Sequence, residues 1–216
     1  MKHYYLVVDT ETTCKGTVAD FGAVIMDRKG AIIEQLGVLV DGHFGKLPLF
    51  SDRNASPESL WSFQSAQRRV KEYDKMLDNG QRIFASYQYI NLWLSRINGQ
   101  YAPAITAYNM SFDSGKCRNT RINIGIFSNR FCLMKLAKAT IGMRPDYHNF
   151  CFENDFLTAK LRQPQMTADA IARYLAGESL EPEPHMALED ARDYEAIILT
   201  EILKTHSRKK ILELGK

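Results

Sequence analysis

The sequence predicts an α/β fold, in which a mixed five-stranded sheet with its first three strands antiparallel is flanked by helices. Three observations support this prediction. Residues 4–8 form a short, continuous apolar run. Two further apolar runs, at residues 21–26 and 31–40, are separated only by a polar turn. From residue 56 onward, helical patterns alternate with short apolar segments, which is typical of helices packed against a sheet.

The three N-terminal runs are predicted to be neighbouring strands. Residues 4–8 are apolar at every position, as in a strand that is covered on both faces. The turn at residues 27–30, Asp-Arg-Lys-Gly, joins the second run to the third. A short polar turn between two apolar runs is typical of a β-hairpin, so the second and third strands are expected to be antiparallel.

Two helices are predicted next. Ser56 is expected to cap the first helix, with Pro57 at its first position. The apolar face of this helix would comprise Leu60, Phe63, Ala66 and Val70. The second is the clearest amphipathic helix of the chain, because apolar residues recur at spacings of three and four: Ile83, Tyr87, Ile90, Leu94 and Ile97.

The second half of the chain is predicted to alternate between strands and helices. Short strands are expected at residues 104–108 and 131–132. Helices are expected from near Asp113, from residue 133, from the cap Thr167 to Gly177, and from about residue 187 to 203.

Residues 143–165 fit this alternation poorly. Aromatic and polar residues are interspersed at residues 146–152, a pattern that favours a small hairpin. We interpret residues 143–165 as an insertion near the mouth of the functional site. Residues 1–216, with this insertion, are predicted to form a single domain without an internal linker.

The composition limits the possible classes of protein. A net charge of +3 permits nucleic acid binding without requiring it, and the basic clusters at 68–71 and 208–210 are interpreted as solvated helix faces. The four cysteines lack C-x-x-C spacing, which argues against a zinc site or a redox pair. No apolar run approaches the about 18 residues that span a bilayer, so no membrane association is expected. A candidate catalytic acid at position 9 argues against a cleavable signal, and a cytoplasmic location in a bacterium or a phage-infected host is expected.

Three separated segments carry acidic residues at the ends of apolar strands or at the start of a helix. Asp9 and Glu11 follow the first strand and are one residue apart, so both side chains point to the same side of an extended chain. Asp113 follows the fourth strand. His185 precedes the last long helix, and Asp190 lies five residues further on.

Four converging carboxylates would repel one another unless cations neutralise them. Oxygen ligands select hard ions such as Mg²⁺ or Mn²⁺. Two such ions about 3.5–4 Å apart stabilise both the attacking and the leaving oxygen in a displacement at phosphorus. His185, with an unperturbed pKa of about 6.5, would then accept the proton of the attacking water.

Each segment alone has a simpler explanation. The acids at residues 9–11 and 109–113 also fit capped turns. His185 fits a surface loop, and Asp190 fits a first-turn acid that interacts with the helix dipole. Their joint occurrence in this order favours a metal-dependent nuclease.

The three segments together resemble the DEDDh exonucleases of the DnaQ-like group, which have a ribonuclease H-like fold. The matching motifs are Asp-Thr-Glu-Thr-Thr at 9–13, Ala-Tyr-Asn-Met-Ser-Phe-Asp at 107–113, and His-Met-Ala-Leu-Glu-Asp-Ala at 185–191. The resemblance extends from residue 4 to about residue 203. It implies 3′→5′ removal of nucleoside 5′-monophosphates by water that two divalent cations activate.

The resemblance also implies roles for individual residues. Asp9, Glu11, Asp113 and Asp190 would bind the two ions, Asp9 would be shared between them, and His185 would be the general base. Glu11 and the backbone near Thr10 would meet the terminal 3′-hydroxyl group. Cys14 and Tyr108 depart from the glycine and the histidine that the family often has at these positions, and these departures concern substrate details and not the five residues expected to do the chemistry.

Substrate contacts are predicted for Thr10, Thr12 and Asn109. The aromatic rings of Trp61 and Phe150 are candidates for base stacking, although a position in the core fits them equally well. Stacking on a protein ring contributes about 1–3 kcal/mol per base. Phe63 and Phe112 are instead expected in the core.

Three hypotheses about function remain open. The first is an exonuclease that degrades single-stranded or frayed DNA, and the size and the segment 143–165 resemble small phage-encoded nucleases. The second is an exoribonuclease acting on RNA 3′ ends or short oligoribonucleotides, because no residue can be assigned to reading the 2′-hydroxyl. The third is a proofreading or accessory subunit bound to a polymerase, and a homodimer is also compatible with the sequence.

Overall fold

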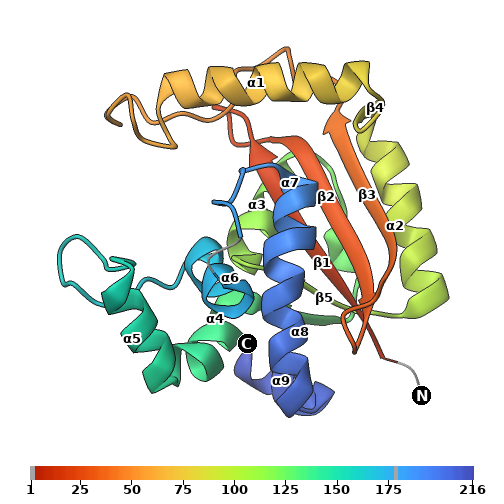
Figure 1. Ribbon diagram of the computed structural model, residues 1–216. Coiled ribbons are helices and arrows are strands. Elements are labelled where there is room, and N and C mark those ends of the chain that lie inside the picture. Colours follow the sequence, from red (N-terminus) through yellow and green to blue (C-terminus); the bar gives the residue numbers. More distant parts are fainter. Residues whose placement is uncertain (1–2, 178–179) are drawn as a thin grey trace.

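The computed structural model describes residues 3–177 and 180–216. Within them the strands form one mixed sheet in the order β4-β3-β2-β1-β5-β6 (Figure 1). The strands are β1 (Tyr4–Thr12), β2 (Val18–Asp27), β3 (Ile32–Val40), β4 (Ile83–Ala85), β5 (Ala104–Ala107) and β6 (Asn129–Cys132). The β1–β2 and β2–β3 pairs are antiparallel, whereas β1–β5, β5–β6 and β3–β4 are parallel. The predicted fold class is confirmed, and β4 is a sixth strand that was not predicted.

Helices cover both faces of this sheet. Their bounds are α1 (Phe63–Asp78), α2 (Tyr87–Tyr101), α3 (Met110–Asn119), α4 (Leu133–Thr140), α5 (Pro145–Glu153), α6 (Ala168–Ala176), α7 (Ala187–Glu189), the π-helix η3 (Asp190–Glu195), α8 (Ala196–Thr205) and α9 (Arg208–Leu214), with short 3₁₀ turns η1 (Ile124–Ile126) and η2 (Ile141–Met143). Apolar residues of α2 and α3 form one core with Leu6 and Val8 of β1, and those of α4, α6 and α8 form another with Tyr5 and Val7. Alternate side chains of β1 therefore pack into two cores on opposite faces of the sheet. Among the described helices, none is both long and apolar enough to cross a bilayer.

Two helix boundaries differ from the sequence prediction. Helix α1 begins at Phe63, where the Ser62 hydroxyl accepts a bond from the backbone N–H of Ser65, and not at the predicted Ser56–Pro57. Helix α2 begins after Ser86, and residues 83–85 pair in parallel with the end of β3. The apolar spacing of 83–97 suits a helix throughout, but the unpaired edge of β3 provides hydrogen bonds that the pattern does not reveal.

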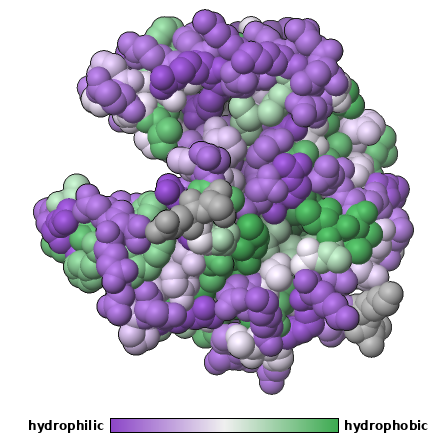
Figure 2. All heavy atoms as spheres, viewed as in Figure 1, coloured by the Kyte–Doolittle hydropathy of each residue, from purple (hydrophilic) through white to green (hydrophobic). Residues whose placement is uncertain are grey.

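The predicted hairpin at residues 146–152 is wrong, because this segment forms helix α5. Pro145 occupies the first position of the helix, where its missing N–H is not needed. Tyr147 and Cys151, four residues apart, are fully buried against the core. The aromatic residues therefore follow a helical spacing. Helix α5 and the loop that follows it form one side of the notch visible at the left of Figure 2.

Two glycines allow the start of the last helical segment to lie directly on the sheet. Gly22 of β2 pairs with Asp9 on one side and with Gly37 of β3 on the other. A Cβ atom on Gly22 would lie 2.1 Å from the backbone carbonyl of Ala187, and one on Gly37 would lie 2.7 Å from the Leu188 side chain. Only glycine permits this approach, which places α7 beside β1 and β2.

We predict that Gly22→Ala destabilises the protein. The new methyl group must push α7 off the sheet, and overpacking of this kind costs about 1–3 kcal/mol or more. For a chain of this size, thermal denaturation should show a melting temperature lower by about 2–4 °C per kcal/mol. Gly99→Ala in α2 is the control, because a Cβ there meets no atom within 4 Å. Equal melting temperatures for the two variants would contradict this account of α7.

Candidate active site

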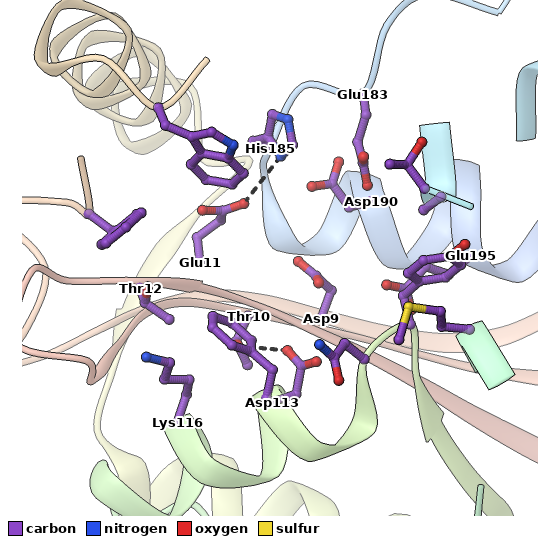
Figure 3. A pocket seen from close by; sticks show the side chains of 18 of the residues that line it. Asp9, Thr10, Glu11, Thr12, Asp113, Lys116, Glu183, His185, Asp190 and Glu195 are labelled. Carbon is purple, nitrogen blue, oxygen red and sulfur yellow. Dashed lines mark hydrogen bonds and ion pairs between the residues drawn. The ribbon is translucent and has the colours of Figure 1, made fainter. Parts of the chain in front are cut away.

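The three motif segments meet at one pocket of about 500 Å³. Asp9 and Glu11 line it from β1, Asp113 from α3, and His185 and Asp190 from the segment that enters the last helices. Figure 3 shows the carboxylates of Asp9 and Asp190 directed toward the same space. The pocket also includes Trp61, before α1, and Thr167, at the start of α6.

The alternation of strand β1 divides its polar residues between two faces of the sheet. Asp9 and Glu11 share the face of Tyr5 and Val7, over which the last helices lie. Thr10 points to the other face, where its hydroxyl donates a hydrogen bond of 2.8 Å to Asp113 Oδ1 (Figure 3). Thr10 therefore holds an acidic residue of α3 beside the end of β1, a role that the sequence did not predict.

A π-helix presents two acids to the pocket. Asp190 opens the segment η3 and Glu195 closes it, and both side chains are buried and line the pocket. The wider π-helical turn places residues five apart on one side of the helix. Sequence reasoning missed Glu195, and it also missed Glu183, which lines the pocket from the loop before His185.

A buried network fixes the segment from His185 to Asp190. Asp20 of β2 accepts hydrogen bonds of 2.9 Å from the Tyr73 hydroxyl and from the backbone N–H of Ala187. Arg82 lies 3.5 Å from Asp20 and also pairs with Glu189 on α7. Because these charged groups are paired, their burial is tolerated. The network ties α7 to the sheet next to the acids of the pocket.

His185 has a backbone conformation that is uncommon for residues other than glycine. Its φ is 57°, in the left-handed region. Its Nδ1 lies 3.8 Å from Glu11 Oε1, and its ring lies 5.1 Å from that of Trp61. Strained conformations of this kind are found mainly where surrounding structure holds a functional side chain in place.

Burial and mutual repulsion raise the pKa values of the acids in the pocket. Burial, followed by the charges of Glu195 and Asp113, holds the pKa of Asp9 well above its ordinary value. Burial raises the pKa of Glu11 to about 8 and that of Asp113 to about 7. The pKa values of three further acids are also raised, mainly by burial: Glu183 to about 7, and Asp190 and Glu195 well above their ordinary values. A cluster of this kind is stable in its ionised form only with nearby positive charge.

His185 is a neutral imidazole at neutral pH. Burial, together with the nearby Arg69 guanidinium, lowers its pKa to about 4. Arg69 was interpreted as part of a solvated helix face, and that is wrong, because its side chain is buried beside Trp61, 5.8 Å from the ring. The neutral ring can accept a proton.

The donor set fits divalent cations. One ligand atom each from Glu11, His185 and Asp190 lie within 4.8 Å of one another, so this group could hold a metal ion. Two buried carboxylate oxygens of the pocket lining, Asp190 Oδ1 and Glu195 Oε2, have no hydrogen-bond partner among the described residues. Buried carboxylate oxygens without partners are costly unless a cation coordinates them.

The structure brings together most of the predicted substrate contacts. Thr10, Thr12, Asn109 and Trp61 line the pocket. Phe150 does not belong to its lining, because it stacks on Phe156 at 5.7 Å and packs against the core. The core positions expected for Phe63 and Phe112 are wrong, since 61% and 46% of these residues are exposed. Phe112 lines the pocket instead, together with Phe50.

Comparison with protein-family models finds no match, and comparison with curated proteins finds no relative. Three solved structures, each 16% identical and covering 99% of this chain, have similar folds. The first is E. coli exonuclease I with a 5cy-dT13 oligonucleotide, with a TM-score of 0.52. The second is the zinc-bound form of the E. coli exonuclease I complex with single-stranded DNA, with a TM-score of 0.50. The third is exonuclease I with the inhibitor BCBP, with a TM-score of 0.55. This chain spans only 42% to 43% of those chains. The likeness shows that the chain has a ribonuclease H-like fold.

Proposed function

We propose that the protein is a metal-dependent 3′→5′ exonuclease that releases nucleoside 5′-monophosphates from single-stranded or frayed DNA. The observation that carries this proposal is the convergence of Asp9, Glu11, Asp113, Asp190 and His185 on one pocket. These residues come from three distant segments, in the order and on the elements expected from the motif resemblance. The fold shared with exonuclease I, whose structures contain an oligonucleotide or single-stranded DNA, supports DNA as the substrate.

Asp9, Glu11, Asp113 and Asp190 would hold two divalent cations, Mg²⁺ or Mn²⁺. Bound there, the ions would lower the pKa of water and neutralise charge that develops on the phosphate. The carboxylates supply hard oxygen ligands, and Glu183 and Glu195 add negative charge beside them. A zinc-bound form of the exonuclease I complex supports metal binding in this fold.

The side chains of the chain itself would orient the strand and move a proton. His185, neutral and exposed to the pocket, would accept a proton from the attacking water. Thr10 keeps Asp113 in place through its 2.8 Å hydrogen bond. Trp61 and Phe50, whose ring centroids are 5.9 Å apart, offer aromatic faces at the mouth of the pocket on which the terminal bases would stack.

Asp190→Asn is expected to abolish most of the activity. The substitution removes one charged ligand, and because charge stabilisation by metal ions contributes several kcal/mol, a loss of about 10³-fold in kcat is expected. The measurement is the stepwise shortening of a 5′-labelled single strand in Mg²⁺ or Mn²⁺. Asp193→Asn, three residues along the same segment and outside the pocket lining, is the matched control. Full activity of Asp190→Asn would refute the proposed function.

His185→Ala is expected to separate proton transfer from metal binding. Loss of a general base lowers kcat by about 10²–10⁴-fold, while the affinity for Mn²⁺, measured by calorimetry, should change little. His148→Ala, at an exposed position of α5, is the control. A loss of Mn²⁺ affinity that matches the loss of activity would show that His185 is a ligand, as its distance from Glu11 allows, and not the base.

The stability of the metal-free protein should fall as pH rises. The folded-state pKa values of Glu11 and Asp113, about 8 and about 7, lie above their ordinary values of 4.5 and 3.8. Between these limits the folded state binds more protons than the unfolded state, so the free energy of unfolding decreases with pH. Thermal melts in EDTA should therefore show a melting temperature that declines from about pH 5 to about pH 8.

Saturating Mn²⁺ should remove this decline, because it binds the ionised carboxylates of the folded state and stabilises it by mass action. The rise in melting temperature on adding Mn²⁺ should accordingly be larger at the alkaline end, and smaller in Asp190→Asn than in the control Asp193→Asn. A melting temperature that is independent of both pH and Mn²⁺ would exclude the electrostatic account of this pocket.

A further inference from the structure

Charge is distributed unevenly along this chain. Residues 114–145 contain seven lysines and arginines and no acidic residue. Since the whole chain has a net charge of +3, the remaining residues together carry −4. The seven cations are Lys116, Arg118, Arg121, Arg130, Lys135, Lys138 and Arg144. This segment includes part of α3, and thus begins directly beside the acidic pocket.

Four of these cations line two hollows in the surface, each of about 350 Å³. The first lies between the end of α3 and β6, and Arg118, Arg121 and Arg130 line it. The second lies between the start of α3 and α4, and Arg130 and Lys135 line it. Neither hollow has an acidic residue in its lining among the described residues.

The two hollows and the active-site pocket are neighbours along the surface. The first and second hollows share Ser114 and Arg130. The second hollow shares Asn109 and Met134 with the active-site pocket. We call this surface, from the active-site pocket to Arg121, the basic groove.

The arginines of the basic groove are exposed and available to a ligand. Among the described residues, no carboxylate lies within ion-pair distance of Arg118, Arg121 or Arg130. Arg144, by contrast, pairs with Glu201 at 3.0 Å and lies outside the groove lining. Three unneutralised guanidinium groups beside one another repel unless an anion binds between them.

We propose that the basic groove binds the sugar–phosphate backbone of the strand whose 3′ end occupies the active-site pocket. This inference rests on the proposed function and adds to it a substrate class, a polynucleotide long enough to extend from the pocket past Arg130. Arginine forms paired hydrogen bonds to phosphate oxygens, and Ser111, Ser114 and Asn123 add hydroxyl and amide donors along the groove. Contacts to phosphates position a strand without reading its sequence.

The test compares three variants with the unmodified protein. The first replaces the groove arginines together: Arg118→Gln, Arg121→Gln and Arg130→Gln. The second replaces the same three by lysine, which keeps the charge. The third is the matched control, with three exposed lysines outside the groove lining replaced: Lys29→Gln, Lys46→Gln and Lys209→Gln. Circular dichroism and thermal melts establish that each variant is folded.

Binding is measured by fluorescence anisotropy across a salt series in Mg²⁺. The probe is labelled oligo-dT with uncleavable phosphorothioate linkages, and its length of about 20 nucleotides exceeds typical single-strand site sizes. The glutamine variant should bind about tenfold or more weakly, and its salt slope should be smaller by about 2, since each lost phosphate contact removes about 0.7 from the slope on single strands. The lysine variant should retain most of the affinity and the slope, and the matched control should equal the unmodified protein.

Activity distinguishes a failure of this inference from a failure of the proposed function. Thymidine 5′-(4-nitrophenyl) phosphate is too short to reach Arg130, so the glutamine variant should hydrolyse it at the normal rate, while its KM for long oligo-dT should rise. Normal affinity and KM for long oligo-dT in the glutamine variant would overturn the groove inference alone. If the unmodified protein hydrolyses neither substrate, the proposed function fails, and the anisotropy series still decides whether the groove binds a polynucleotide.

Discussion

The contact between helix α7 and the sheet is the constraint on which the site depends. Gly22 and Gly37 leave no side chain between the sheet and the backbone of residues 187–188, and Asp20 accepts the N–H of Ala187 at 2.9 Å. The helix start is therefore held at a fixed height above β1. This placement sets the positions of His185 and Asp190, which flank α7 and face the end of the same strand.

The close contact brings like charges together, and the fold tolerates them in different ways. Asp20 is as buried as Asp190 and Glu195, and its Oδ1 likewise has no hydrogen-bond partner among the described residues. However, Arg82 lies 3.5 Å from that oxygen and the Tyr73 hydroxyl donates to the other one, so the charge of Asp20 is compensated and it serves as a structural anchor. Asp190 and Glu195 each keep one buried oxygen without a hydrogen-bond partner, and among the described residues no cationic side chain lies within ion-pair distance of either. Paired buried charges stabilise a conformation, whereas unpaired ones indicate a site for a ligand. On one face of the sheet, the compensated acid therefore supports the structure, whereas the uncompensated acids are the candidates for ligand binding.

The opposite charge is concentrated on the other side of the pocket. The segment that begins in α3 carries the excess of cations, whereas Glu183, Asp190 and Glu195 come from the loop and helices after residue 180. Asp113 and Lys116 lie one helical turn apart on α3, and both line the pocket, so this helix connects the two regions of charge (Figure 3). An electrostatic gradient across a pocket orients a polyanion before it binds.

The sequence alone determined the features that depend on local spacing. The alternation of β1 predicted that Asp9 and Glu11 share a face, and the hairpin signal predicted the antiparallel strands, because both follow from the two-residue period of an extended chain. Only the tertiary structure decided the rest. Residues 83–85 became a strand because β3 offered an edge, and Arg69 became buried because the segment around Trp61 folds over it. Glu195 enters the site through a π-helical turn, whose irregular period no apolar pattern encodes.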